Sequence, residues 1–199
     1  EQYVASFISN QNISSCVIGR DGRSSGKDIA QWVTNALTKY GVRVDNCDLA
    51  TTPTMQLMTE KDKYDGGIVI TASHNPIEYN GLKFLQSDGT FLSPDQCKIL
   101  FESVDNNLTL NESERVASVS NYTSANQEHI SKVFDAKSID VKNIRSKKFK
   151  VVIDAVNGGA SSILPQLCND LGCDIEMINC AGDGNFTRVA EPLAENLKD

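Results

Sequence analysis

Short apolar runs rich in β-branched residues alternate along this chain with longer segments of helical periodicity. Residues 15–19, 42–45 and 67–70 have the composition of buried strands. Residues 27–40 carry their apolar side chains on one helical face, and Gly41 marks the end of that helix. Because a strand, a helix and a second strand follow one another, we expect a crossover connection and parallel strands. The pattern predicts an α/β fold.

Other helices are predicted from the residues that start or interrupt them. One is expected to begin at Pro53 after a threonine cap, and another at residues 93–96, where Ser, Pro, Asp and Gln form a strong start signal. Residues 1–12 have the spacing of the end of a helix. Residues 105–121 are rich in Asn, Ser and Glu and predict an exposed excursion, and residues 122–134 predict a helix after it.

The chain divides into two predicted units, residues 1–135 and residues 136–199. The boundary falls in a charged and polar stretch, where domain linkers are usually found. Beyond it, residues 149–155 and 173–178 predict strands on either side of a helix at 160–171. This is a single βαβ unit, which is too little to complete a second α/β domain.

The candidate chemistry lies on the loop that follows the strand at 67–70. Residues 71–76 read TASHNP, and a second strand predicted at 82–86 returns Lys83 to the same edge of the sheet. Ligands of α/β folds bind beyond the carboxyl ends of such strands. Ser73, His74 and Lys83 offer a hydroxyl, an imidazole and an ammonium group, which suit the handling of a phosphoryl group.

Composition narrows the function without naming it. The 199 residues are 40% hydrophobic and 23% charged, as in an ordinary globular protein. The net charge of -7 argues against a nucleic-acid-binding surface. We find no run long enough to span a bilayer, so no membrane partner is expected. The six cysteines lack CxxC spacing and are expected to be free thiols of a cytoplasmic protein.

Simpler interpretations compete for each candidate residue. Ser73 could be a turn serine, and Lys83 an ordinary surface lysine. A hydrolase pair of Ser73 and His74 is disfavoured because adjacent side chains of an extended chain point to opposite sides. Arg23 could bind an anion or pair with Asp21. Asn157 and the two glycines after it predict a tight turn rather than a nucleotide cradle, since no Walker lysine follows.

Four segments, in order along the chain, resemble the α-D-phosphohexomutases, the family of phosphoglucomutase and phosphomannomutase. They are GRDGRSSG at 19–26, TPT at 52–54, TASHNP with NGLK at 71–83, and GNF with EPLAENL at 184–197. The resemblance implies an α/β domain I with a mixed sheet between helices and the start of a similar domain II. It also implies that the intact enzyme interconverts hexose 1-phosphates and 6-phosphates through a bisphosphate.

The resemblance assigns a role to each candidate residue. Ser73 would be the phosphorylated serine that donates a phosphoryl group to the sugar and later takes one back. His74 and Lys83 would assist catalysis, while Arg23 and Asn75 would contact the hexose phosphate substrate. Mg²⁺ would be the cofactor, with the phosphate on Ser73 as one ligand; the family's three aspartate ligands do not occur in this chain.

The resemblance further implies that this chain is an N-terminal part of the enzyme. The family's earlier arginine segment and its C-terminal domains have no counterpart here, so we expect the chain alone to be inactive as a mutase. A stand-alone, non-catalytic sugar-phosphate-binding or interaction module is the alternative. The sequence does not distinguish glucose, mannose and glucosamine phosphates.

Overall fold

A five-stranded sheet forms the centre of the larger unit in the computed structural model, which describes residues 1–60 and 64–197. The strand order is β4-β3-β1-β2-β5. The strands are β1 (Ser15–Arg20), β2 (Arg43–Leu49), β3 (Gly66–Ile70), β4 (Leu82–Gln86) and β5 (Val119–Asn121). Only β4 runs antiparallel to its neighbour, so the predicted α/β fold with a mixed sheet is confirmed.

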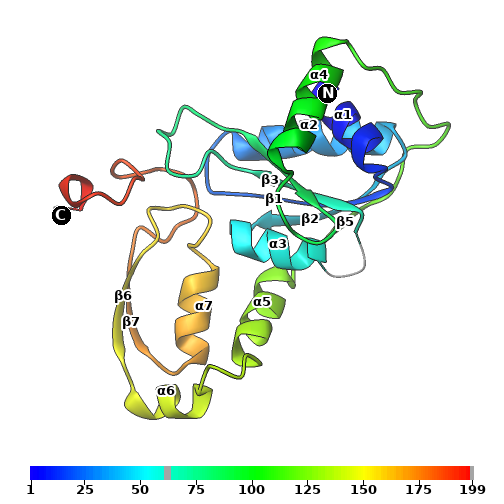
Figure 1. The fold of residues 1–199 in the computed structure, drawn as a ribbon. Helices are drawn as coiled ribbons and strands as arrows, with labels where there is room; N and C mark the ends of the chain where they lie inside the picture. The colour runs from blue at the N-terminus through cyan, green and yellow to red at the C-terminus, as the bar shows by residue number, and fades with distance from the viewer. Residues whose placement is uncertain (61–63, 198–199) are drawn as a thin grey trace.

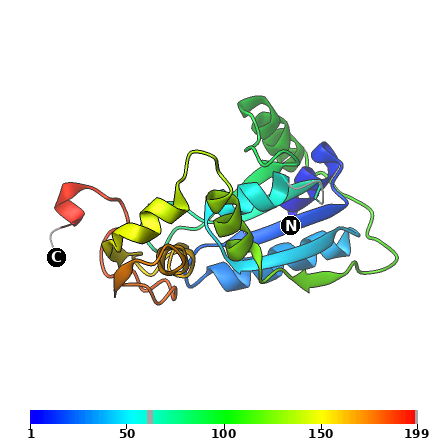
Figure 2. The ribbon, with the colours of Figure 1, turned by 90° about the horizontal axis from the view of Figure 1, so that it is seen from below.

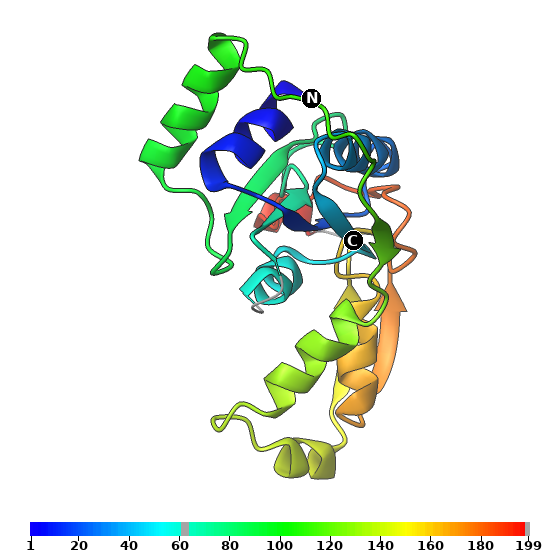
Figure 3. The same cartoon turned by 90° about the vertical axis from the view of Figure 1, so that its right-hand side faces the viewer.

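Helices cover both faces of this sheet (Figures 1 and 3). On one face lie α1 (Gln2–Gln11), α2 (Gly26–Lys39) and α4 (Pro94–Asp105). On the other face lie α3 (Thr52–Glu60) and the start of α5 (Ala125–Phe134). The sheet is therefore a buried middle layer, which explains the continuous apolar runs of its central strands.

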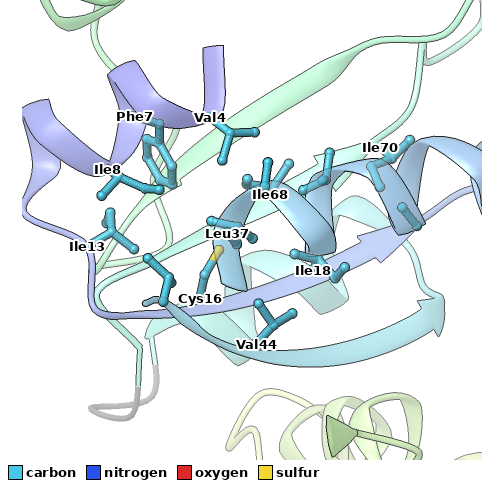
Figure 4. Close-up of a cluster of buried hydrophobic side chains, with 14 of the residues drawn as sticks. Val4, Phe7, Ile8, Ile13, Cys16, Ile18, Leu37, Val44, Ile68 and Ile70 are labelled. Carbon is cyan, nitrogen blue, oxygen red and sulfur yellow. The ribbon is translucent and has the colours of Figure 1, made fainter. Parts of the chain in front are cut away.

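The alternation of β3 divides the core between the two faces. Ile68 and Ile70 point to the α1–α2 side and pack with Phe7 and Leu37, all of them fully buried (Figure 4). Val69 points the other way, toward α3. Successive side chains of a strand alternate between faces, so three consecutive apolar residues are needed to serve both layers.

A smaller unit follows, in which β6 (Lys150–Asp154) and β7 (Asp174–Ile178) pair in parallel with α7 (Ile163–Asp170) against them. The short helix α6 (Val141–Lys147) precedes β6. Figure 2 shows this unit beside the layered unit, and α5 contacts both α3 and α7. Among the residues described, no helix has the length and apolar content needed to cross a bilayer.

Two predicted boundaries were wrong. The excursion at 105–121 ends in β5, which pairs with β2, and Tyr122 donates its amide to the Asn46 carbonyl at 2.7 Å. Helix α5 therefore begins at Ala125 rather than at residue 122. Strand β5 is exposed along its length, so no apolar signal marked it. Helix α7 begins at Ile163 rather than at residue 160, because turns occupy residues 158–162.

Candidate active site

Ser73 lies on the connection from β3 to β4, just beyond a strand that is buried along its whole length. Its backbone has a φ of 58°, a left-handed conformation that is uncommon for residues other than glycine. The Ser73 amide donates to Thr71 Oγ1 at 2.9 Å, and that hydroxyl donates to Asp21 Oδ2 at 2.7 Å. These bonds hold the turn while leaving Ser73 exposed at the sheet edge.

Arg23 holds the connection between β3 and β4, residues 71–81, which we call the serine loop. Its side chain is fully buried, and Nη1 donates to the carbonyls of Pro76 at 2.6 Å and Tyr79 at 2.9 Å. Nη2 donates to the carbonyls of Ser73 at 3.0 Å and Asn75 at 2.7 Å.

The remaining donor of Arg23, Nε, pairs with Asp21 Oδ2 at 3.1 Å. The guanidinium carbon lies 5.1 Å from the centre of the Phe186 ring, which belongs to the second unit. All five N–H donors of an arginine are thus used within the protein. In this geometry Arg23 holds the loop and pairs with Asp21, as in the ion-pair alternative. Its predicted contact with the substrate stays a prediction.

His74 lies closer to Ser73 than the sequence suggested. Ser73 Oγ and His74 Nδ1 are 3.4 Å apart, a long hydrogen-bonding distance. The expectation that the two side chains diverge was wrong because it assumed an extended chain, whereas Ser73 is left-handed. On the other side of the ring, His74 Nε2 lies 3.0 Å from Glu191 Oε2.

A hollow of about 310 Å³ opens beside Ser73 and His74. Asp21, Thr51 and Thr71 line it from the larger unit. Gly158 and Gly159 line it from the second unit, at the turn between β6 and α7. The predicted tight turn at 157–159 thus forms a wall of the hollow. A hollow at strand ends that is lined partly by hydroxyl and carboxylate side chains and is closed by the next unit can hold a small polar ligand.

Asn75 and Lys83 make contacts of their own apart from the Ser73 hydroxyl. The Asn75 carbonyl faces Arg23, and its side chain is exposed. Lys83 pairs with Val69 in register, but its Nζ lies 5.6 Å from the centre of the Phe91 ring. Lys83 lines a separate, largely apolar cavity between β4 and α4.

The described residues do not supply a metal site at Ser73. Within residues 1–60 and 64–197, no three side chains of His, Cys, Asp or Glu gather closely enough to hold an ion. Asp21, the carboxylate near the loop, is occupied by Thr71 and Arg23. A Mg²⁺ ion bound at a phosphorylated Ser73 would need carboxylates from outside these residues.

Sequence reasoning missed Asp21 and Glu191 as parts of the site. Asp21 lies two residues before Arg23 and accepts the Arg23 amide at 3.0 Å, so the GRDGR spacing held a local signal. Glu191 is separated from His74 by more than a hundred residues, and no periodicity links them. Its role becomes visible only when the second unit packs on the first.

Fold and site together define an α/β protein that presents an exposed serine at the end of a buried strand. Residues 1–110 match the family model described as phosphoglucomutase/phosphomannomutase, alpha/beta/alpha domain I. Residues 127–199 match the model of alpha/beta/alpha domain II of the same family. The chain belongs to the phosphoglucomutase/phosphomannomutase family. The predicted unit boundary at 135/136 stays a prediction.

Named relatives agree with this assignment. A probable phosphoglucosamine mutase of Methanopyrus kandleri is 33% identical over 92% of this chain, which spans 39% of that protein. A phosphoglucomutase/phosphomannomutase of Thermococcus kodakarensis is 36% identical over 92% of the chain and 40% of its own length. The chain thus spans about two fifths of the length of these curated relatives.

Solved structures share the fold. A phosphoglucomutase/phosphomannomutase family protein of Burkholderia thailandensis superposes with a TM-score of 0.70 and 26% identity, over 94% of this chain and 40% of its own. A putative phosphomannomutase of Thermus thermophilus superposes with a TM-score of 0.76 over 89% of this chain and 40% of its own; at 18% identity it supports the fold alone.

Proposed function

We propose that the protein is a phosphohexomutase that interconverts hexose 1-phosphates and hexose 6-phosphates. One observation carries the proposal: the exposed hydroxyl of Ser73 lies on a left-handed turn at the end of a buried central strand. The relatives named above, which are called mutases of phosphoglucosamine, phosphoglucose or phosphomannose, support the substrate class.

The proposed reaction moves one phosphoryl group twice. A sugar hydroxyl attacks phosphorus in line and gives up its proton, while the bond between phosphorus and Ser73 Oγ breaks and the serine oxygen takes up a proton. The products are a hexose bisphosphate and a free serine hydroxyl. The second half runs in reverse at the other sugar position: Ser73 Oγ attacks and gives up its proton, and the sugar oxygen leaves and takes up a proton. The protein's task in such a transfer is to hold both oxygens in line and to balance the phosphate charge.

Each of the other predicted residues has a proposed part. We assign His74 a part in catalysis at the Ser73 hydroxyl, because its Nδ1 lies 3.4 Å from Ser73 Oγ. Arg23 positions the loop through its carbonyls. The catalytic role predicted for Lys83 and the substrate contact of Asn75 stay predictions, because Lys83 Nζ lies over the Phe91 ring and the Asn75 side chain is exposed.

Three expectations that rest on the family alone also belong to the proposal. Mg²⁺ is the proposed cofactor of the full-length protein, where it would neutralise charge on the transferred phosphoryl group. A cytoplasmic location and the inactivity of the 199-residue chain as a mutase are proposed on the same ground. The alternative, a non-catalytic sugar-phosphate-binding module, is not favoured, because the relatives that cover nearly the whole chain are named as enzymes.

Replacing Ser73 by alanine in the full-length protein tests the proposal. Turnover of glucose, mannose and glucosamine phosphates should fall by about a thousandfold or more, because the group that carries the phosphoryl is gone. Ser131→Ala is the matched control, since that hydroxyl is exposed and donates to the Gln127 carbonyl of its own helix. Undiminished turnover by Ser73→Ala would overturn the proposed function.

A further inference from the structure

Ser73, His74 and Glu191 form a chain of contacts across the two units. Ser73 Oγ lies 3.4 Å from His74 Nδ1, and His74 Nε2 lies 3.0 Å from Glu191 Oε2. The His74 side chain is 59% exposed and that of Glu191 33%, so the ring is not held by burial. Its two nitrogens are therefore the groups that fix its orientation.

The backbone of Glu191 takes part in local hydrogen bonds. Its carbonyl accepts the Leu193 amide at 2.8 Å and the Asn196 side-chain amide at 2.9 Å, within a segment that closes in a 3₁₀ turn. Upstream, Arg188 pairs with Asp154 at the end of β6 at 2.7 Å. The segment, drawn in red in Figure 1, is thus tied to the second unit. Its Glu191 carboxylate contacts His74 on the connection between β3 and β4.

We propose that Glu191 is a positioning residue that sets the tautomer and orientation of His74; the proposal deepens the proposed function and rests on it. An ionised carboxylate only accepts hydrogen bonds, so the proton of a neutral His74 ring belongs on Nε2, facing Glu191. Nδ1 then has no proton and accepts the hydrogen bond of the Ser73 hydroxyl.

The tautomer of His74 sets the orientation of the Ser73 hydroxyl. With its hydrogen directed to His74 Nδ1, the lone pairs of Ser73 Oγ are free to face an incoming phosphorus atom. A serine that must take back a phosphoryl group needs this orientation before the bond forms. Glu191 thereby gives domain II a part in preparing the serine of domain I.

Nitrogen NMR of the 199-residue chain tests the tautomer directly, because the chain contains only two histidines, His74 and His129. Spectra are taken at about pH 8.5, where imidazole rings are neutral. In the unmodified chain the His74 ring should show the Nε2-protonated pattern. In Glu191→Ala it should change to a mixture of tautomers, while Glu191→Gln, which keeps an acceptor oxygen, should restore the pattern.

The controls lie in the same chain. His129 contacts Thr54 Oγ1 through its Nδ1 at 2.9 Å, so its signals should stay unchanged in every variant and report an intact fold. Glu195→Ala removes an exposed glutamate of the same segment and should leave His74 unaltered. A His74 ring that keeps the Nε2-protonated pattern in Glu191→Ala would overturn the proposal.

A kinetic measurement separates this proposal from the proposed function. In the full-length protein, Glu191→Ala should lower kcat about tenfold and change KM less than twofold, because the serine is misoriented while the sugar still binds. Equal kcat for Glu191→Ala and the parent would refute the positioning role. The failure of Ser73→Ala to lower turnover would instead refute the mutase proposal and leave the tautomer result standing.

Discussion

The buried guanidinium of Arg23 joins three parts of the molecule through one side chain. It bonds four carbonyl oxygens of the serine loop, pairs with Asp21 beside it, and lies against Phe186 of the second unit. Loop carbonyls that have left the sheet need partners when they are turned inward. Arg23 supplies those partners, and the shape of the loop therefore depends on a planar group with several donors.

We expect Arg23→Lys to weaken the fold although the positive charge is retained. One ammonium group cannot reach four carbonyls and Asp21, so several buried groups would lose their partners, at a cost of about 3 kcal/mol in the free energy of unfolding. Urea denaturation measures the loss. Arg115→Lys, on an exposed segment, should change stability by less than about 0.5 kcal/mol. Equal stability of the two variants would contradict the role given to Arg23.

The hydrogen bonds that Asp65 accepts from Ser14 and Ser15 lead to a prediction about how stability depends on pH. The Ser14 hydroxyl is the main cause that lowers the pKa of Asp65, and the Ser14 amide and Ser15 add to it. A carboxyl whose folded pKa is lowered stabilises the fold above its unfolded pKa, about 3.9, and this stability is lost as the pH falls through the folded value.

Asp65→Asn should therefore reduce the free energy of unfolding by about 1–2 kcal/mol at neutral pH. The difference from the parent chain should shrink below about pH 4, where Asp65 takes up a proton. Denaturation measured at several pH values tests this, with Glu114→Gln as an exposed control for the same loss of charge. A difference that stays constant down to pH 2 would exclude the ionised carboxylate as its cause.

At the scale of elements, helices and strands with a strong apolar pattern could be predicted from the sequence. Elements defined by hydrogen bonds, without such a pattern, were missed. Strands β1 and β3 are fully or nearly buried and were marked by apolar runs. Strand β5 is exposed, and hydrogen bonds to β2 alone define it. The start of α7 was misplaced because the residues before Ile163 form turns and not a first helical turn.

The site shows the same division. Ser73 could be predicted because a buried strand, a proline and the family motif mark its loop in one continuous stretch. The role of Arg23 could not, because a sequence shows an arginine without showing which carbonyls it faces. Lys83 was expected at the serine since its strand returns to that edge, but its long side chain turns to Phe91.

The start of α4 offers a prediction about a whole helix. Ser93 accepts the Gln96 amide at 3.2 Å, and the Gln96 side chain accepts the Ser93 amide at 2.8 Å, so the predicted cap is confirmed as a capping box. Ser93→Ala should cost about 1 kcal/mol of stability, while Ser93→Asp should keep most of it. Thermal unfolding distinguishes them; equal melting temperatures for Ala and Asp would show that the cap contributes nothing.

At the scale of the molecule, the second unit packs on the serine support at a very close backbone approach. A Cβ atom added at Gly184 would overlap the Gly22 carbonyl oxygen, which directly precedes Arg23. The Gly184 amide donates to the Asn157 carbonyl at 3.0 Å, so the turns of the second unit and the arginine loop form one packed layer. Domain II is therefore positioned to affect the order of the serine loop as well as to line the hollow.

Alanine substitutions at two glycines of the second unit distinguish the effect of this contact from the effect of backbone strain. Both Gly184 and Gly172 have positive φ, 74° and 70°, so alanine at either costs about 1 kcal/mol of local strain. Only Gly184→Ala also collides with the larger unit; at Gly172 the nearest atom is the flexible end of Lys148, 3.4 Å away. Gly184→Ala should therefore speed amide hydrogen exchange at residues 20–23 and 71–76, whereas Gly172→Ala should leave those amides as they are. Equal exchange at the serine loop in both variants would mean that the order of the loop does not depend on the Gly184 contact. The proposed action of Glu191 on His74 would then be the remaining link between the two domains.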